Sequence, residues 1–309
     1  MFESVLHRDS NPFLEKLHPA AALAYLAVLL VMAMSMDHPL FLVGLLALLG
    51  LTALSLGGWD LWNSFLKLGL GMSVLIMLVN PLMVRAGENI LWYGPRVPVA
   101  GPLNVSLEAV CYGAAMSVKL LDIVSIFCLY ILMVHPDRML DLFSRLAFRS
   151  ALVSCLAARM FPAMTRRLEG IRRIQELRGV DFSRGKWSKR ARSYAGLVDA
   201  LLLSSLEDSM EIAEAMEARA FNSGRRSCYR PNLWRPRDTL CLAGSVTALG
   251  VVIYGAAKGF LHYNYYPSLD AVVKGWETPA LVIWVLLFLS IPAVMNWGWS
   301  RWPFFRAKI

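Results

Sequence analysis

The chain has 309 residues, of which 57% are hydrophobic and only 17% are charged, and its mean hydropathy is +0.51. Soluble globular domains average about 25% charged residues, so this composition excludes most soluble enzymes and nucleic-acid-binding proteins. The formal net charge of +9 is therefore interpreted as the cytoplasmic bias of Lys and Arg in membrane proteins, and we expect no nucleic-acid partner.

Apolar runs of about the length of a membrane helix occur along the chain, where a span requires roughly 17–25 residues. They cover residues 20–36, 39–56, 65–84, 107–134, 239–256 and 279–296. Only Asp37, His38 and Pro39 lie between the first two runs, which predicts a tight helical hairpin. The predicted fold is an all-α polytopic helical membrane protein with about six transmembrane helices, embedded in a lipid bilayer.

Most of the 31 Lys and Arg residues fall in segments that lie on one side of the membrane if the N-terminus is inside. The positive-inside rule then places both termini in the cytoplasm. We divide the chain into a transmembrane bundle at 1–134, a cytoplasmic region of long helices at 135–238 and a transmembrane hairpin at 239–309. The outer loop at 85–104 is rich in Gly and Pro and predicts a cap or short hairpin.

Aromatic residues of the two outer loops are predicted at the outer membrane interface, where amphipathic rings prefer to lie. They are Trp92, Tyr93, Tyr263, Tyr265, Tyr266 and Trp276.

The cytoplasmic region contains two long helical patterns. Between residues 162 and 178, apolar residues recur at helical spacing and charged residues occupy the other face, which is typical of an amphipathic helix. Gly179 is a helix-stop signal. A second pattern covers residues 189–220 and ends near Asn222, Ser223 and Gly224.

The two patterns end in similar sequences, Glu176-Leu177-Arg178-Gly179 and Glu217-Ala218-Arg219-Ala220. The helix dipole alone favours an arginine at such an end by about 0.3–1 kcal/mol. The repetition suggests more, because a guanidinium suits bidentate binding to a carboxylate better than an ammonium does. We therefore expect both arginines to be presented to an acceptor on another molecule.

Sequence signals for catalysis are weak. The chain has no H-E-x-x-H motif, and residues 179–188 fail the phosphate-loop pattern because Trp187 stands where Ser or Thr is required. Asp137 and Asp141 share a helix face after His135, but no third metal ligand converges with them. We predict no catalytic residue, no metal site and no cofactor in this chain, so any ATP and Mg²⁺ would be bound by another polypeptide.

Two features of the membrane runs are singled out. Lys119 and Asp122 lie three residues apart on one helix face, which predicts a mutually neutralising structural pair. Gly69 and Gly71 in the third run predict a place where a helix approaches closely.

On several motifs the chain resembles the transmembrane T components of energy-coupling factor (ECF) transporters, the EcfT/CbiQ group. The matching segments are 10–19, 80–82, 135–140, 158–162, 175–182 and 215–221. In that group, Ala-Arg-Gly signatures end two cytoplasmic coupling helices. This chain departs from the signature at Leu177, which replaces Ala, and at Ala220, which replaces Gly.

The resemblance implies a non-catalytic subunit of an ATP-driven importer in a bacterial or archaeal plasma membrane. It implies as partners two ABC-type ATPase subunits and a small substrate-binding membrane (S) subunit, for uptake of a vitamin or of cobalt or nickel ion. We assign the close helix approach at Gly69 and Gly71 to this substrate-binding partner. The arginines of the signatures dock into ATPase grooves, a role that carries over to Arg178 and Arg219. The implied coupling site comprises Glu176, Arg178, Gly179, Glu217, Arg219 and Ala220.

Two other classes stay open on the residues alone. One is a membrane-embedded enzyme, such as a lipid or prenyl transferase, that uses Asp137, Asp141 and the basic loop. The other is an ordinary ABC permease with its own substrate path, which would carry polar residues through several spans.

Overall fold

The computed structural model describes residues 17–84, 89–97, 101–134, 136–144, 147–180, 182, 187–221, 223–224, 234–259, 263–267, 269–271 and 276–301. The chain forms two compact units, one made of Met1–Arg138 with Asn232–Ile309 and the other of Met139–Pro231. The three-part division of the sequence stays a prediction. Both chain termini lie outside the described residues, and so does His135.

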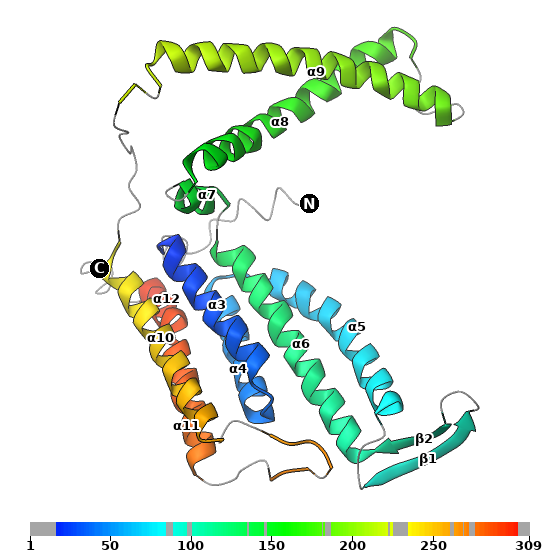
Figure 1. Ribbon diagram of the computed structural model, residues 1–309, viewed down its shortest axis with the longest axis vertical. Helices are drawn as coiled ribbons and strands as arrows, with labels where there is room; N and C mark the ends of the chain where they lie inside the picture. The colour runs from blue at the N-terminus through cyan, green and yellow to red at the C-terminus, as the bar shows by residue number, and fades with distance from the viewer. Residues whose placement is uncertain are drawn as a thin grey trace. The chain divides into compact units, whose positions relative to one another are not determined.

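The first unit is a helical bundle (Figure 1). Its helices are α3 (Pro19–Ser35), α4 (Pro39–Ser55), α5 (Trp59–Met83), α6 (Leu107–Met133), α10 (Pro236–Ala257), α11 (Glu277–Leu289) and α12 (Ile291–Arg301). Helix α6 packs against α5, α4 and α3, while α10 packs against α3 and α11.

The bundle has the lengths and composition of a polytopic membrane protein. Helices α5, α6 and α10 are long and apolar enough to cross a membrane, and the pair α11 and α12, bent by 45°, forms a fourth candidate. The bend lies at Ser290, two residues before Pro292, whose ring removes a backbone donor and disfavours a straight helix. Helices α3 and α4 have 17 residues each, so the count of about six spans stays a prediction.

The predicted hairpin between the first two helices is present. Helix α3 ends at Ser35, and α4 begins at Pro39, whose fixed φ suits the first turn of a helix. The loop predicted as a cap or hairpin contains two antiparallel strands, β1 (Ile90–Val97) and β2 (Gly101–Ser106), whose register shifts twice.

Small residues bring α5 and α6 together, as is common in membrane helices. A Cβ atom on Gly69 would lie 2.8 Å from Cδ2 of Leu121, whereas one on Gly71 would meet nothing within 4 Å. Ser73 and Ser117 bond reciprocally across the same interface, each hydroxyl donating to the other residue's carbonyl at 3.3 and 3.1 Å. Gly69 therefore contacts a helix of this chain and not the partner to which the sequence assigned it, because α6 occupies this face of α5.

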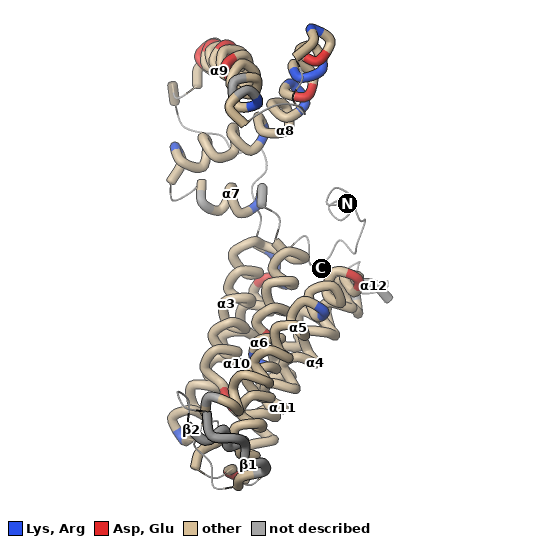
Figure 2. Tube along the Cα trace, turned by 90° about the vertical axis from the view of Figure 1, so that its right-hand side faces the viewer, with Lys and Arg blue, Asp and Glu red and all other residues tan. Residues whose placement is uncertain are grey.

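The second unit consists of two long helices, α8 (Phe148–Leu177) and α9 (Trp187–Ala218), and α7 (Pro136–Ser144) connects it to the bundle. Charged residues gather on α8 and α9, whereas the bundle helices carry few (Figure 2). Helix α8 begins 14 residues before Pro162, where the sequence predicted its start. A proline removes only one backbone donor, and the Ala- and Leu-rich stretch before it has high helix propensity.

Candidate functional site: the ends of the two long helices

The ends of α8 and α9 have the same backbone geometry. Gly179 donates to the Glu176 carbonyl and Val180 to the Gln175 carbonyl, both at 3.0 Å. At the end of α9, Ala220 donates to the Glu217 carbonyl at 2.8 Å and Phe221 to the Met216 carbonyl at 3.0 Å. These pairs of bonds define a Schellman cap at each helix end.

Each cap requires one residue with positive φ. Gly179 adopts φ +86° and Ala220 adopts φ +54°. Glycine has no Cβ and takes this conformation freely, whereas an L-residue with a side chain is disfavoured by about 1–2 kcal/mol. The glycine of the signature thus has a backbone role, which Ala220 performs with some strain.

The caps place Arg178 and Arg219 at the outermost positions of their helices, and both residues are exposed. The carboxylate of the neighbouring Glu176 already has an ion-pair partner, since Arg172 donates to it at 2.9 Å. Within the part of the chain that the structure describes, neither Arg178 nor Arg219 forms an ion pair with a carboxylate. Each guanidinium is therefore available to a group on another molecule.

Apolar side chains lie exposed along the two helices. Leu177 is 89% exposed at the end of α8, and Met210 near the end of α9 is 66% exposed. Further exposed apolar residues of α9 are Val198, Leu202, Leu203 and Leu206. Several exposed apolar residues on one helix are typical of a protein interaction site.

A polar contact joins the two helices where they cross. Arg167 of α8 donates from Nη1 to the Ser204 hydroxyl at 2.6 Å and to the Asp208 carboxylate of α9 at 2.5 Å. A second contact joins the start of α8 to the end of α9, where the rings of Phe148 and Phe221 lie 6.3 Å apart. These contacts could not be predicted from the sequence, because residues far apart in the chain on separate helices share no local pattern.

A buried aromatic residue anchors the connection between the helices. Phe182 is 3% exposed, and its ring lies 5.8 Å from the Arg172 guanidinium and 5.4 Å from the Tyr194 ring. Arg190 donates to its carbonyl at 3.2 Å. Residues 181 and 183–186 of this basic loop lie outside the described residues.

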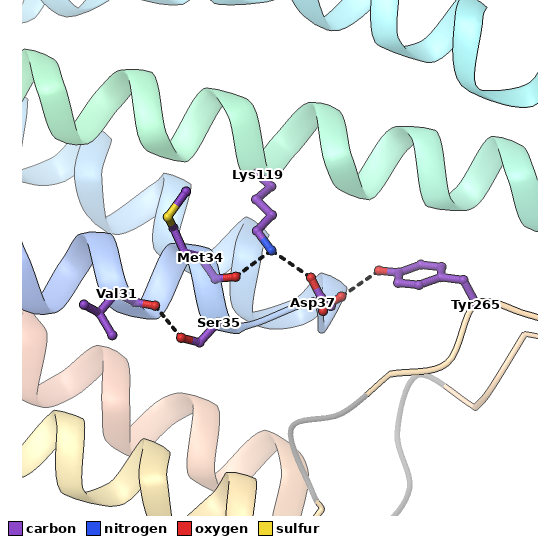
Figure 3. Close-up of polar contacts among 6 residues, drawn as sticks. All are labelled: Val31, Met34, Ser35, Asp37, Lys119 and Tyr265. Atoms are coloured by element: carbon purple, nitrogen blue, oxygen red, sulfur yellow. Dashed lines mark hydrogen bonds and ion pairs between the residues drawn. The ribbon is translucent and has the colours of Figure 1, made fainter. Parts of the chain in front are cut away.

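The predicted Lys119–Asp122 pair is wrong. Lys119 instead donates from Nζ to the Asp37 carboxylate and to the Met34 carbonyl, both at 2.8 Å (Figure 3). Asp122 is fully buried in α6, and neither carboxylate oxygen has a hydrogen-bond partner. The flexible lysine reaches an acceptor on a neighbouring helix hairpin, and the sequence spacing on α6 gave no sign of this.

Two of the tyrosines predicted at the outer membrane interface are buried within the bundle. Tyr263 is 7% exposed and Tyr265 is 6% exposed. Tyr265 donates its hydroxyl to the Asp37 carbonyl at 2.7 Å (Figure 3). Burial raises the pKa of Tyr265 above its ordinary value, so its hydroxyl remains a donor.

The acids considered for a membrane enzyme, Asp137 and Asp141, belong to α7. Among the residues that the structure describes, no group of three or more His, Cys, Asp or Glu side chains is placed to hold a metal ion.

The chain is thus a polytopic helical membrane protein whose second unit consists of two long, charged helices that end in exposed arginines. Comparison with known proteins agrees with it, because the family model for the cobalt transport protein CbiQ matches residues 10–229. The chain therefore belongs to this family, the transmembrane T components of ECF transporters.

Named relatives support the assignment. The chain is 25% identical over 260 residues to the energy-coupling factor transporter transmembrane protein EcfT of Staphylococcus aureus, which covers 79% of this chain and 92% of the relative. It is 26% identical to EcfT of Heliobacterium modesticaldum over 230 residues, 69% of this chain and 85% of the relative. It is 29% identical to EcfT of Listeria innocua over 165 residues, which cover 50% of this chain and 62% of the relative. The chain is thus a multi-pass membrane component of a transporter of this kind.

Proposed function

We propose that this chain is the coupling subunit of an ECF-type importer, which transmits ATP-driven movement to a substrate-binding membrane subunit. Two separate ABC-type ATPase subunits bind the ATP and Mg²⁺, and this chain performs no catalysis. The proposed cargo is a vitamin, or cobalt or nickel ion; cobalt agrees with the description of the matching family, a cobalt transport protein.

One observation carries the proposal: two long helices end in the same cap, and each cap presents an exposed arginine. A guanidinium presented in this way suits bidentate binding to a carboxylate on a partner. Two helix ends with the same cap fit two receptor subunits, which is the stoichiometry of an ATPase pair.

The transmission of movement requires stiffness. Packed elements move as units and do not deform continuously, so a helix held at its end by an ATPase acts as a lever along its whole length. Helices α8 and α9 have 30 and 32 residues, which corresponds to about 45–48 Å at 1.5 Å per residue. Their exposed apolar residues provide surface for the subunits that they contact.

The proposed orientation places both termini and the long helices in the cytoplasm, where the ATPases reside. It rests on the excess of Lys and Arg in the region of α8 and α9.

Co-purification tests the proposal. The variant Arg178→Ala/Arg219→Ala is expected to insert normally but to lose the ATPase subunits and uptake, because truncating one partner of a buried, hydrogen-bonded charge pair costs about 2–5 kcal/mol. Arg166→Ala/Arg173→Ala removes two exposed arginines of α8 that lie outside the cap and serves as the matched control. Arg178→Lys/Arg219→Lys keeps the positive charges and removes the bidentate donor geometry of the guanidinium, so this variant is expected to bind the ATPase subunits weakly. Normal uptake by the double alanine variant would overturn the proposal.

A further inference from the structure

Two cavities in the membrane bundle meet at a shared wall. An apolar cavity of ≈430 Å³ is lined by Leu75, Ile76, Val79, Asn80, Tyr112 and Met116. A polar cavity of ≈410 Å³ is lined by four tyrosines and four other residues. They are Tyr112, Tyr263, Tyr265 and Tyr266, with Asp37, Met116, Lys119 and Asn264. Tyr112 and Met116 belong to both, so a ligand with an apolar and a polar part has space for each beside the same two side chains.

Unequal helix lengths create the polar cavity. Helices α3 and α4 have 17 residues and α6 has 27, a difference of about 15 Å at 1.5 Å per residue. The segment with Tyr263 and Tyr265 covers the short hairpin: the Tyr263 ring lies 5.7 Å from the His38 ring, and Tyr265 bonds to the Asp37 carbonyl. The polar cavity is therefore an open recess beside the α3–α4 hairpin, walled by α6 and by the segment with the tyrosines.

The polar cavity contains one cation and one anion with unused bonding capacity. Two hydrogen bonds of the Lys119 ammonium go to Met34 and Asp37, which leaves one of its three N–H donors. The Asp37 carboxylate accepts through Oδ1 and is 38% exposed, and within the described residues no donor is recorded for its Oδ2. The pair therefore complements a small zwitterion, with an anionic group at Lys119 and an ammonium at Asp37.

The tyrosines favour an ammonium as the cationic part. The ring of Tyr112 lies 5.4 Å from that of Tyr265 and 5.6 Å from that of Tyr266. Aromatic rings that surround a site attract a cation through their π faces.

Two buried donors at the cavity walls have no hydrogen-bond partner. They are Nδ2 of Asn80 at the apolar cavity and the hydroxyl of Tyr266 at the polar one. An unsatisfied buried polar group costs about 1–3 kcal/mol, so oxygen acceptors on a ligand would stabilise both. Leu75 and Val79, which line the apolar cavity, are 61% and 42% exposed and supply walls for a hydrocarbon chain.

We propose that the two cavities together bind one zwitterionic phospholipid, with its phosphate at Lys119, its ammonium at Asp37 and the tyrosines, and an acyl chain along Leu75, Ile76 and Val79. The ester oxygens lie near the shared wall and accept from Asn80 and Tyr266. The site holds a lipid between α5, α6 and the loop after α10, and it is independent of the proposed docking of Arg178 and Arg219.

Native mass spectrometry of the purified full chain tests this site. After delipidation, phosphatidylethanolamine is titrated in detergent, with phosphatidylglycerol and free phosphoethanolamine as comparison ligands. We expect the zwitterionic lipid to bind at least tenfold more tightly than either of the others, a difference of about 1.4 kcal/mol. The lipid with a glycerol headgroup lacks the ammonium, and the free headgroup lacks the acyl chain.

Variants assign the binding to the cavities. Lys119→Met and Met116→Trp are each expected to weaken phosphatidylethanolamine binding by roughly tenfold or more, since one removes the phosphate contact and the other fills the shared wall. Lys67→Met and Val74→Trp remove a charge and add a ring at exposed positions on the other face of α5 and are expected to bind like the parent. Binding unchanged in both cavity variants, or equal binding of the three ligands, would overturn the proposal.

Discussion

Arg167 and Asp208 form an ion pair of 2.5 Å between α8 and α9, and the same guanidinium nitrogen donates to Ser204. Both members are partly exposed, with side-chain exposures of 40% and 33%. Exposed pairs of this kind are worth roughly 0.2–1 kcal/mol, so this contact contributes little to overall stability. Its importance lies in fixing how the two long helices cross, so that they move as a unit.

We therefore expect Arg167→Ala to lower uptake while ATP hydrolysis by the assembled transporter continues, because helices that slip at their crossing transmit less movement. The ratio of substrate transported to ATP hydrolysed measures this coupling. The charge swap Arg167→Asp/Asp208→Arg is expected to restore part of it, as a double-mutant cycle detects. Equal coupling in the parent and in Arg167→Ala would show that the pair has no mechanical role.

The cap of α9 is strained at Ala220, whose positive φ is unfavourable for a residue with a side chain. Ala220→Gly is expected to stabilise the end of α9 by about 1 kcal/mol, because glycine adopts its φ of +54° without a Cβ penalty. Gly179→Ala is expected to weaken the matching cap of α8 by a similar amount, since there the added Cβ meets nothing within 4 Å and only the backbone is strained. Amide hydrogen exchange at Val180 and Phe221 measures both effects. A decrease in protection at Phe221 in Ala220→Gly would contradict this account.

Gly69 and Gly71 form a matched pair for the packing of α5 on α6. Gly69→Val is expected to destabilise the bundle by about 1–3 kcal/mol, because its side chain overlaps Leu121. Gly71→Val projects into open space and is expected to leave the thermal unfolding midpoint in detergent nearly unchanged. If the two variants unfold at the same temperature, α5 does not pack on α6 through Gly69.

Asp122 is a buried carboxylate without a partner in a membrane helix. An ionised group at such a place costs several kcal/mol, so Asp122→Asn, which keeps the shape and cannot ionise, is expected to be at least as stable as the parent. Asp37→Asn is the contrasting variant. It is expected to destabilise the protein by about 1–3 kcal/mol, because the Lys119 ammonium loses its charged acceptor. Thermal unfolding measures both, and marked destabilisation by Asp122→Asn would show that the carboxylate is needed.

The sequence predicted those features that depend on local chemistry. The hairpin at Asp37, His38 and Pro39 follows from a turn signal between two apolar runs. The end of α8 at Gly179 follows from the conformational preference of glycine. The repeated arginine at the end of a helix is also visible from spacing alone, so the candidate site could be located before the structure was known.

Features that depend on tertiary packing were missed. Lys119 bonds to Asp37, 82 positions away, instead of Asp122 on its own helix. The segment with Tyr265 covers a hairpin 228 positions earlier in the chain. Such contacts are set by helix lengths and packing, which neither local periodicity nor residue propensity encodes.

Site-specific photo-crosslinking tests the central claim most directly, because it leaves both arginines in place. A photoreactive residue is introduced at Leu177 or Ala218, immediately before Arg178 and Arg219, and Glu169 in the exposed middle of α8 serves as the control position. The account expects adducts with an ATPase subunit from positions 177 and 218 and none from 169. Adducts from neither helix end, in membranes where the transporter is active, would contradict it.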